Sequence, residues 1–224
     1  MNTEQLKRIV FDLISATIAW ILFFCYRKKI IEKAELEISE TLIYGTVAVS
    51  LFWLIIYILS DNYKDVRRVS RLNELYTTIF QSIFGCLIIF FFLIIDDIEN
   101  YTNYKFYYES IFVLTLSHFF ITFLFRYMIT NSMVNQIHSK KVTFNTILIG
   151  NPKSIVKIFN LIETMPRSAG NKIIGYINDT QNEDIPSIEL KNLGSMNNLV
   201  KILKDNAIEE AILSFDKKDD IDIS

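Results

Sequence analysis

Four long apolar stretches dominate the first 130 residues of this 224-residue chain. They cover about residues 9–26, 42–60, 75–95 and 108–129, and each approaches the roughly 20 residues with which a helix crosses a bilayer core of ~30 Å. The first stretch is too long, and ends in side chains too bulky, for a cleaved signal peptide. The sequence therefore predicts a membrane α-helical fold class for residues 1–130, an anchor of four transmembrane helices, followed by a linker over residues 131–142.

The remaining residues, 143–224, alternate short apolar runs with amphipathic segments. This alternation is typical of a parallel sheet whose strands are joined by helices, and it predicts a small α/β module that forms half of a doubly wound, Rossmann-like sheet. The expected elements are a strand at 143–150, a helix to about Met165, a strand at 172–178, a helix at 196–205 and a strand at 208–215.

The first strand of this module ends where a dinucleotide would bind in a complete Rossmann fold. That fingerprint requires three glycines at fixed spacing, and this sequence supplies Gly150 alone. Pro152 stands where the second glycine belongs and has no backbone N–H to offer a phosphate. A bare helix N-terminus can still bind an anion. We nevertheless expect no cofactor here and a structural or docking role for the module.

Basic residues near the helix ends indicate the topology. Short loops rich in Lys and Arg stay in the cytoplasm, and eight such residues lie on the side of the N-terminus against five on the other. This balance predicts that both termini are cytoplasmic and that the loop with Asp96, Asp97 and Glu99 lies outside. The net charge of −2 gives no indication of a nucleic-acid partner. The two cysteines, Cys25 and Cys86, lie in apolar stretches and are expected to be free thiols.

Two charged residues fall inside the apolar stretches at similar depth. Asp12 lies about one turn inside the first helix and Arg126 about one turn inside the end of the fourth. Because an unpaired charge is costly in a membrane, we expect these two residues to form an intramembrane ion pair, unless each extends separately to the headgroups. His118 lies near the middle of the fourth stretch. It is interpreted as an interhelical hydrogen-bonding residue, with Gln81, Ser82, Ser15 and Thr17 as candidate partners at comparable depth.

A basic loop separates the second and third apolar stretches. Its four cations are Lys64, Arg67, Arg68 and Arg71. Such a cluster beside a membrane can bind anionic or polyprenyl-phosphate lipid headgroups. It can also do no more than set the topology and dock the α/β module. Apolar residues at every third position from Tyr63 to Leu72 predict a short interfacial helix in this loop.

The order of these features resembles the N-terminal region of bacterial polyprenyl glycosylphosphotransferases, the long-form sugar transferases. That family has four transmembrane helices, a Rossmann-like, CoA-binding-like module and a C-terminal catalytic domain. The residues that carry the resemblance are Phe52-Trp53, then Tyr63, Lys64, Arg67, Ser70, Arg71, Leu72 and Glu74, then Asp96-Asp97, then Arg126, and finally the run Phe144–Gly150.

The resemblance implies transfer of a sugar 1-phosphate from a UDP-sugar to undecaprenyl phosphate, at the bacterial inner membrane, to start a capsule, exopolysaccharide or O-antigen. The family's Mg²⁺-dependent chemistry belongs to its C-terminal domain, which this chain does not contain. The residues themselves agree, since they include no nucleophile with an adjacent base, no clustered carboxylates and no metal-ligand spacing. We therefore expect no catalytic, cofactor-binding or metal residue, and an anchor and assembly role for this chain.

Two other interpretations remain open. Membrane-bound nucleotide-sugar 4,6-dehydratases or epimerases resemble the chain in the same opening layout, but an NAD-binding domain follows there. A standalone membrane scaffold would use the module to bind partners. The resemblance and the small, incomplete sheet both favour a homodimer, because a sheet of three strands leaves an edge unprotected.

Overall fold

The structure is a computed structural model that describes residues 3–36, 40–97, 105–178, 185 and 187–214. It consists of two compact units, Met1–Met133 and Val134–Ser224. The predicted loop residues 98–104 and the tail 215–224 lie outside the described residues.

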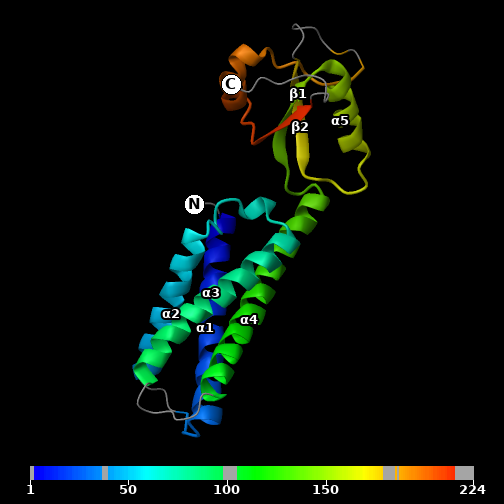
Figure 1. The fold of residues 1–224 in the computed structure, drawn as a ribbon. Helices are drawn as coiled ribbons and strands as arrows, with labels where there is room; N and C mark the ends of the chain where they lie inside the picture. Colours follow the sequence, from blue (N-terminus) through cyan, green and yellow to red (C-terminus); the bar gives the residue numbers. More distant parts are fainter. Residues whose placement is uncertain (1–2, 37–39, 98–104, 179–184, 186, 215–224) are drawn as a thin grey trace. The chain divides into compact units, whose positions relative to one another are not determined.

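The first unit is a bundle of helices whose neighbours run in opposite directions (Figure 1). Its helices are α1 (Thr3–Tyr26), α2 (Glu40–Leu59), α3 (Arg71–Asp97) and α4 (Lys105–His138), and α1 continues into a π-helical turn, Arg27–Ile31. Within the described residues, four helices are long and apolar enough to cross a membrane. The prediction of four long apolar helices is therefore confirmed.

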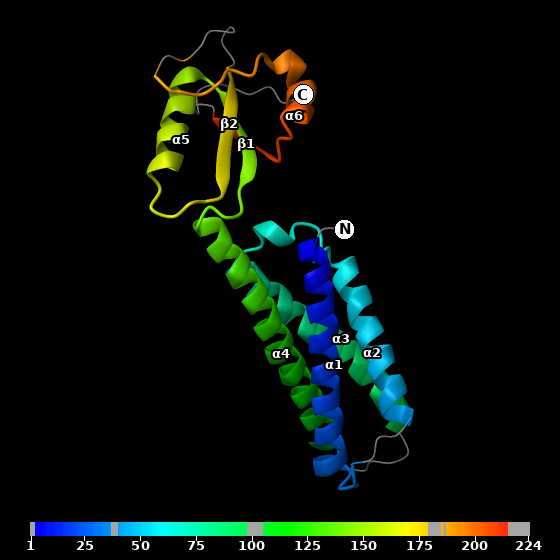
Figure 2. The same cartoon turned by 180° about the vertical axis from the view of Figure 1, so that it is seen from behind.

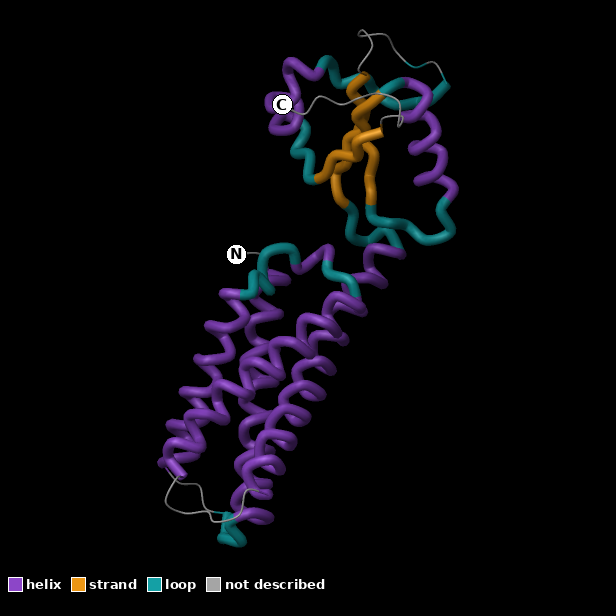
Figure 3. The backbone as a smooth tube through the Cα atoms, in the orientation of Figure 1, coloured by secondary structure: helices purple, strands orange, loops and turns teal. Residues whose placement is uncertain are grey.

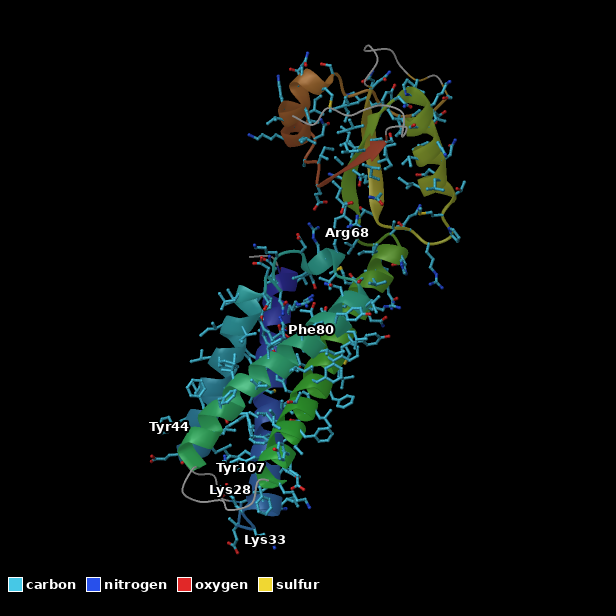
Figure 4. All side chains as sticks on the ribbon, in the orientation of Figure 1. Lys28, Lys33, Tyr44, Arg68, Phe80 and Tyr107 are labelled. Atoms are coloured by element: carbon cyan, nitrogen blue, oxygen red, sulfur yellow. The ribbon has the colours of Figure 1, made fainter. Side chains whose placement is uncertain are left out.

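The surface of the bundle is apolar, as a lipid-facing surface requires. Tyr44 and Phe80, for example, are mostly exposed and extend away from the helices in Figure 4. The interior contains an aromatic core around Trp53, Tyr57 and Phe23. Gly85 lets α3 approach this core closely, because a Cβ atom at this position would lie 2.3 Å from the Trp53 ring. Of the two free cysteines, Cys86 is buried and Cys25 partly buried.

Three boundaries differ from those expected. Helix α1 begins at Thr3 because the polar residues before the apolar stretch are good helix formers. Helix α4 continues to His138, so most of the segment 131–142, predicted as a linker, is helical. No Gly or Pro interrupts residues 130–138, and Met133 and Ile137, one turn apart, are both buried. The helix expected in the basic loop is limited to one 3₁₀ turn, Val66–Arg68, and α3 already begins at Arg71.

The second unit contains a three-stranded parallel sheet in the order β2-β1-β3 (Figure 2). The strands are β1 (Phe144–Gly150), β2 (Asn171–Asn178) and β3 (Glu210–Ser214), joined by α5 (Pro152–Thr164) and α6 (Leu199–Asp205). All three strands were expected, although residue 215 lies outside the described residues. The helix expected at 196–205 begins with a 3₁₀ turn, Met196–Asn198.

The two helices of this unit cover opposite faces of the sheet (Figure 3). Leu148 and Tyr176 pack with Ile155 of α5 on one face, whereas Ile147 and Ile177 pack with Ile202 of α6 on the other. The central strand β1 is buried on both faces, which explains its nearly continuous apolar sequence. The unit is therefore a small α/β module, as the sequence predicts.

Candidate functional site

The most distinctive feature of the bundle is a cluster of buried polar and charged side chains at the end where α1 begins. We call it the polar cluster. Each helix contributes to it, and so does the loop between α2 and α3. Its members are Arg8, Asp12, Ser15, Tyr57, Asn62, Tyr63, Glu74, Thr78, Gln81, Ser82, His118, Thr122, Arg126 and Thr130.

The spacing of these residues explains why they converge. Helical residues four apart lie on the same face. On α4, polar residues recur at every fourth position from His118 through Thr122 and Arg126 to Thr130, and all four are buried. On α3, Glu74, Thr78 and Ser82 repeat the pattern, and Gln81 lies beside them. Two polar stripes therefore face each other inside an otherwise apolar bundle.

Asp12 and Arg126 meet in the middle of the cluster. Arg126 Nε donates to Asp12 Oδ1 at 2.7 Å, and Arg126 Nη2 donates to Asp12 Oδ2 at 3.1 Å. This is the two-pronged geometry that suits a guanidinium and a carboxylate. Both side chains are almost completely buried. The structure therefore joins the two residues that their similar depth in the sequence led us to pair.

The rest of the Arg126 guanidinium is also occupied. Arg126 Nη1 donates to Gln81 Oε1 at 2.9 Å, and the guanidinium carbon lies 4.3 Å from the centre of the Tyr57 ring. Asn62 completes this environment: with its amide oriented so that its oxygen faces inward, it accepts from Arg126 Nη2 at 3.0 Å. Glu74 lies 3.9 Å from Arg126 Nη1. Each donor nitrogen of Arg126 thus has an acceptor.

A second buried ion pair lies nearer the end of the bundle. Arg8 Nη2 donates to Glu74 Oε1 at 2.5 Å, and Thr130 Oγ1 donates to Glu74 Oε2 at 2.9 Å. Glu74 also lies near Arg126. The charges of the cluster therefore alternate in space, in the order Arg8, Glu74, Arg126 and Asp12. Alternation keeps the cluster neutral, which is the condition under which charges are tolerated away from water.

His118 lies at the deep end of the cluster. Its Nδ1 atom is 2.9 Å from Ser82 Oγ, and its Nε2 atom is 2.9 Å from the Tyr57 hydroxyl. The ring stacks on Trp53 with 3.5 Å between ring centroids. Of the candidate partners expected from the sequence, Ser82 binds His118. The others bind elsewhere: Gln81 to Arg126, Ser15 to Thr122, and Thr17 to Ser50.

The basic loop lies at the same end of the bundle, where Figure 4 labels Arg68, whereas Lys28 and Lys33 lie at the opposite end. Lys64 pairs with Asp61 at 2.8 Å on the surface. Arg67 and Arg68 form the 3₁₀ turn, and Arg71 is the first residue of α3. Each of these three arginines takes part in at least one interaction with the rest of the chain. The basic loop thus lies at the same end of the bundle as the polar cluster.

Tyr63 connects this loop to the cluster. Its hydroxyl donates to Asp12 Oδ2 at 2.9 Å, and its carbonyl oxygen accepts from Gln5 Nε2 at 2.8 Å. Burial and the neighbouring Asp12 carboxylate raise the pKa of the Tyr63 hydroxyl well above its ordinary range. The hydroxyl therefore stays protonated and remains a donor.

In the α/β module, the end of β1 is closed rather than open. A Cβ atom at Gly150 would lie 2.0 Å from the Ser214 carbonyl oxygen of β3, so the two strand ends touch. The Asn151 side chain accepts from the Ser154 N–H at 2.9 Å and so caps α5 itself. Asn151 is thus the N-cap of α5, and Pro152 is the first residue of the helix. Since Asn151 occupies part of the N-terminus of α5, less of it remains available to a phosphate.

No protein-family model matches the sequence, and no curated protein is significantly similar to it.

Several cluster residues were not predicted from the sequence, chiefly the pairing of Arg8 with Glu74 and the contact of Tyr63 with Asp12. Arg8 is one of the eight basic residues that indicate the topology, and Glu74 directly precedes the third apolar stretch. The fourfold spacing of polar residues on α4 and α3 was the available signal, because it marks a polar face within a membrane helix.

Proposed function

We propose that this chain is the membrane-anchor and assembly region of a sugar transferase, which moves a sugar 1-phosphate from a UDP-sugar to undecaprenyl phosphate. The observation that carries the proposal is the order of the parts: four membrane helices followed directly by a small parallel α/β module with a helix on each face. This is the layout that the resemblance implies. Further support comes from the basic loop beside the start of α3.

In this proposal the chain does not perform the transfer. The polar cluster holds the helices in one arrangement, because each of its buried charges is paired with an opposite charge on another helix. The module lies in the cytoplasm of a bacterial cell, with both termini on that side of the inner membrane. The Mg²⁺-dependent step belongs to a separate catalytic domain of the same enzyme.

The module would also assemble the enzyme as a homodimer. Strand β3 is at an edge of the sheet, and its Leu213 side chain is 62% exposed. An exposed apolar edge strand is a surface that proteins usually cover. The mass of the particle in detergent, measured by light scattering, tests this point. A wild-type particle with the mass of a monomer, unchanged in the Leu213→Lys variant, would contradict the proposed dimer.

The decisive experiment is the intact mass of the native protein in its source membranes, with its C-terminal peptides sequenced. We expect a mass above 26.2 kDa by a domain of roughly 100–200 residues that carries an Asp-Glu pair and a further amphipathic membrane segment. A Gly-x-x-Gly-x-x-Gly sequence after a strand would instead identify a dehydratase or epimerase. A mass of 26.2 kDa would identify a standalone scaffold and end the transferase proposal.

A further inference from the structure

The two buried arginines of the polar cluster differ in how well they are satisfied. Each guanidinium nitrogen of Arg126 has an acceptor. Arg8 is 2% exposed, yet it makes one hydrogen bond, from Nη2 to Glu74. Its Nε and Nη1 atoms are buried and have no hydrogen-bond partner among the described residues.

Such donors are unusual, because a buried polar group without a partner loses its hydration and gains nothing in return. The carboxylates of the cluster already serve other groups. Glu74 binds Arg8 and Thr130, and Asp12 binds Arg126 and Tyr63. The free donors of Arg8 therefore indicate an acceptor that comes from outside the chain.

The loop shows how such an acceptor could reach Arg8. Gln5, Arg8 and Asp12 lie on one face of α1, since they are spaced by three and four residues. Tyr63 forms a hydrogen bond at each end of this face. Its carbonyl oxygen accepts from Gln5, and its hydroxyl donates to Asp12. Tyr63 therefore bridges the stretch of helix that carries Arg8. Release of these two bonds would lift the loop and uncover the guanidinium.

The charges around this position favour an anion. Within the eight residues 64–71, four are basic and one is acidic. The helix α3 begins its apolar span at Arg71, and Glu74, the partner of Arg8, is one turn further in. Arg8 is thus at the depth where a membrane helix passes from headgroups to acyl chains. The anions present in quantity at that depth are lipid phosphates, and basic clusters at membrane surfaces attract them.

We propose that Arg8 lies at the bottom of a phosphate-binding site. The phosphate group of an anionic membrane lipid occupies this site when residues 61–70 move away from α1. Arg8 supplies hydrogen-bond donors to the phosphate while Glu74 holds the side chain in place. The cations of the loop supply the surrounding positive charge. The site does not depend on the reaction proposed above, because it requires nothing but a membrane containing anionic lipid.

The test is native mass spectrometry of the full chain in detergent, titrated with phosphatidylglycerol, phosphatidylcholine or inorganic phosphate. We expect the wild type to prefer phosphatidylglycerol to phosphatidylcholine. The double variant Arg8→Gln/Glu74→Gln leaves no buried charge unpaired. It should bind phosphatidylglycerol at least about tenfold more weakly, because one hydrogen bond to a charged group contributes about that much to affinity. The matched control Lys7→Gln, which removes the adjacent but exposed cation, should leave that affinity unchanged.

Tyr63→Phe provides a second measurement that does not require a change inside the bundle. It removes the bond to Asp12 that holds the loop down, and it should strengthen phosphatidylglycerol binding. Unchanged or weaker binding by Tyr63→Phe, or wild-type affinity in the Arg8→Gln/Glu74→Gln variant, would overturn the proposal. Displacement of phosphatidylglycerol by millimolar inorganic phosphate would assign the site to free phosphate and overturn the lipid assignment.

Discussion

The helix bundle buries a network of charged and polar side chains beside its aromatic core, whereas the core of the α/β module is mainly apolar. Inside the bundle lie two ion pairs, a histidine and several hydroxyl groups, whereas large apolar side chains cover its surface. Inside the module, β1 buries isoleucine and leucine on both faces of the sheet. The difference follows from the solvent, since lipid gives apolar groups no reason to withdraw while water does. The bundle therefore depends on polar contacts for its specificity, and the module on apolar packing.

The largest effect should come from breaking the central pair of the bundle. Arg126→Gln leaves the buried Asp12 carboxylate without its charged partner, so we expect a loss of about 3–5 kcal/mol in the free energy of unfolding. Unfolding of the purified protein in bicelles or mixed micelles measures this loss.

A double-mutant cycle sharpens this result. Because the two side chains contact each other, Asp12→Asn/Arg126→Gln should lose clearly less than the sum of its two single variants. Lys105→Gln, which removes a cation from an exposed pair, is the control and should have little effect. Strict additivity of the two single changes would show that the pair contributes nothing.

The second effect compares one substitution in the two regions. Leu148→Ala in the module removes a completely buried side chain and should cost about 2–5 kcal/mol. Leu124→Ala on α4 removes the same atoms from a side chain that is 57% exposed, and lipid can fill the space. We expect almost no loss of stability there. Equal losses in the two variants, measured by thermal unfolding, would contradict the contrast between the regions.

The third effect tests how tightly the interior of the bundle is packed. Gly85→Ala places a methyl group against the Trp53 ring and should destabilise the bundle by about 1–3 kcal/mol. Gly45→Ala is the matched control, because its nearest neighbour would be 3.2 Å away, on the Trp20 ring. Thermal unfolding should show this loss in the first variant and a clearly smaller one in the second. Losses of similar size in both would mean that close approach at Gly85 is unimportant.

The smallest effect concerns the loop. Because the pKa of Tyr63 is raised in the folded state, its contribution to loop closure is fully present below the ordinary tyrosine value of 10.0 and is lost only as the pH rises through the higher folded value. Hydrogen exchange of residues 61–70 should therefore show no pH-dependent opening between pH 6 and about 9, once the intrinsic exchange rate is corrected for. Opening of this segment near neutral pH would contradict the contact with Asp12.

The sequence predicts a large part of this structure because its signals are periodic. The length of the apolar stretches identifies the membrane helices, and the continuous apolar run of β1 identifies a strand buried on both faces. Asp12 and Arg126 could be paired because depth in a membrane can be counted from the helix ends. Arg8 and Glu74 could not, since both lie near the boundary, where water or a headgroup would serve either of them equally well. Their pairing depends on how α1, α3 and α4 pack, since Glu74 also binds Thr130 of α4.

The order of the strands has a consequence for how the module forms during synthesis. The central strand β1 is the first to leave the ribosome. Ser214 of β3, whose hydroxyl donates to the Ile149 carbonyl oxygen, follows Ile149 by 65 positions. At ordinary elongation rates of 5–20 residues per second, the most apolar segment of the module waits about 3–13 s for its second neighbour. The newly made protein thus passes through an interval in which an apolar strand with one unpaired edge is tethered beside the membrane, exposed to chaperones and to other nascent copies.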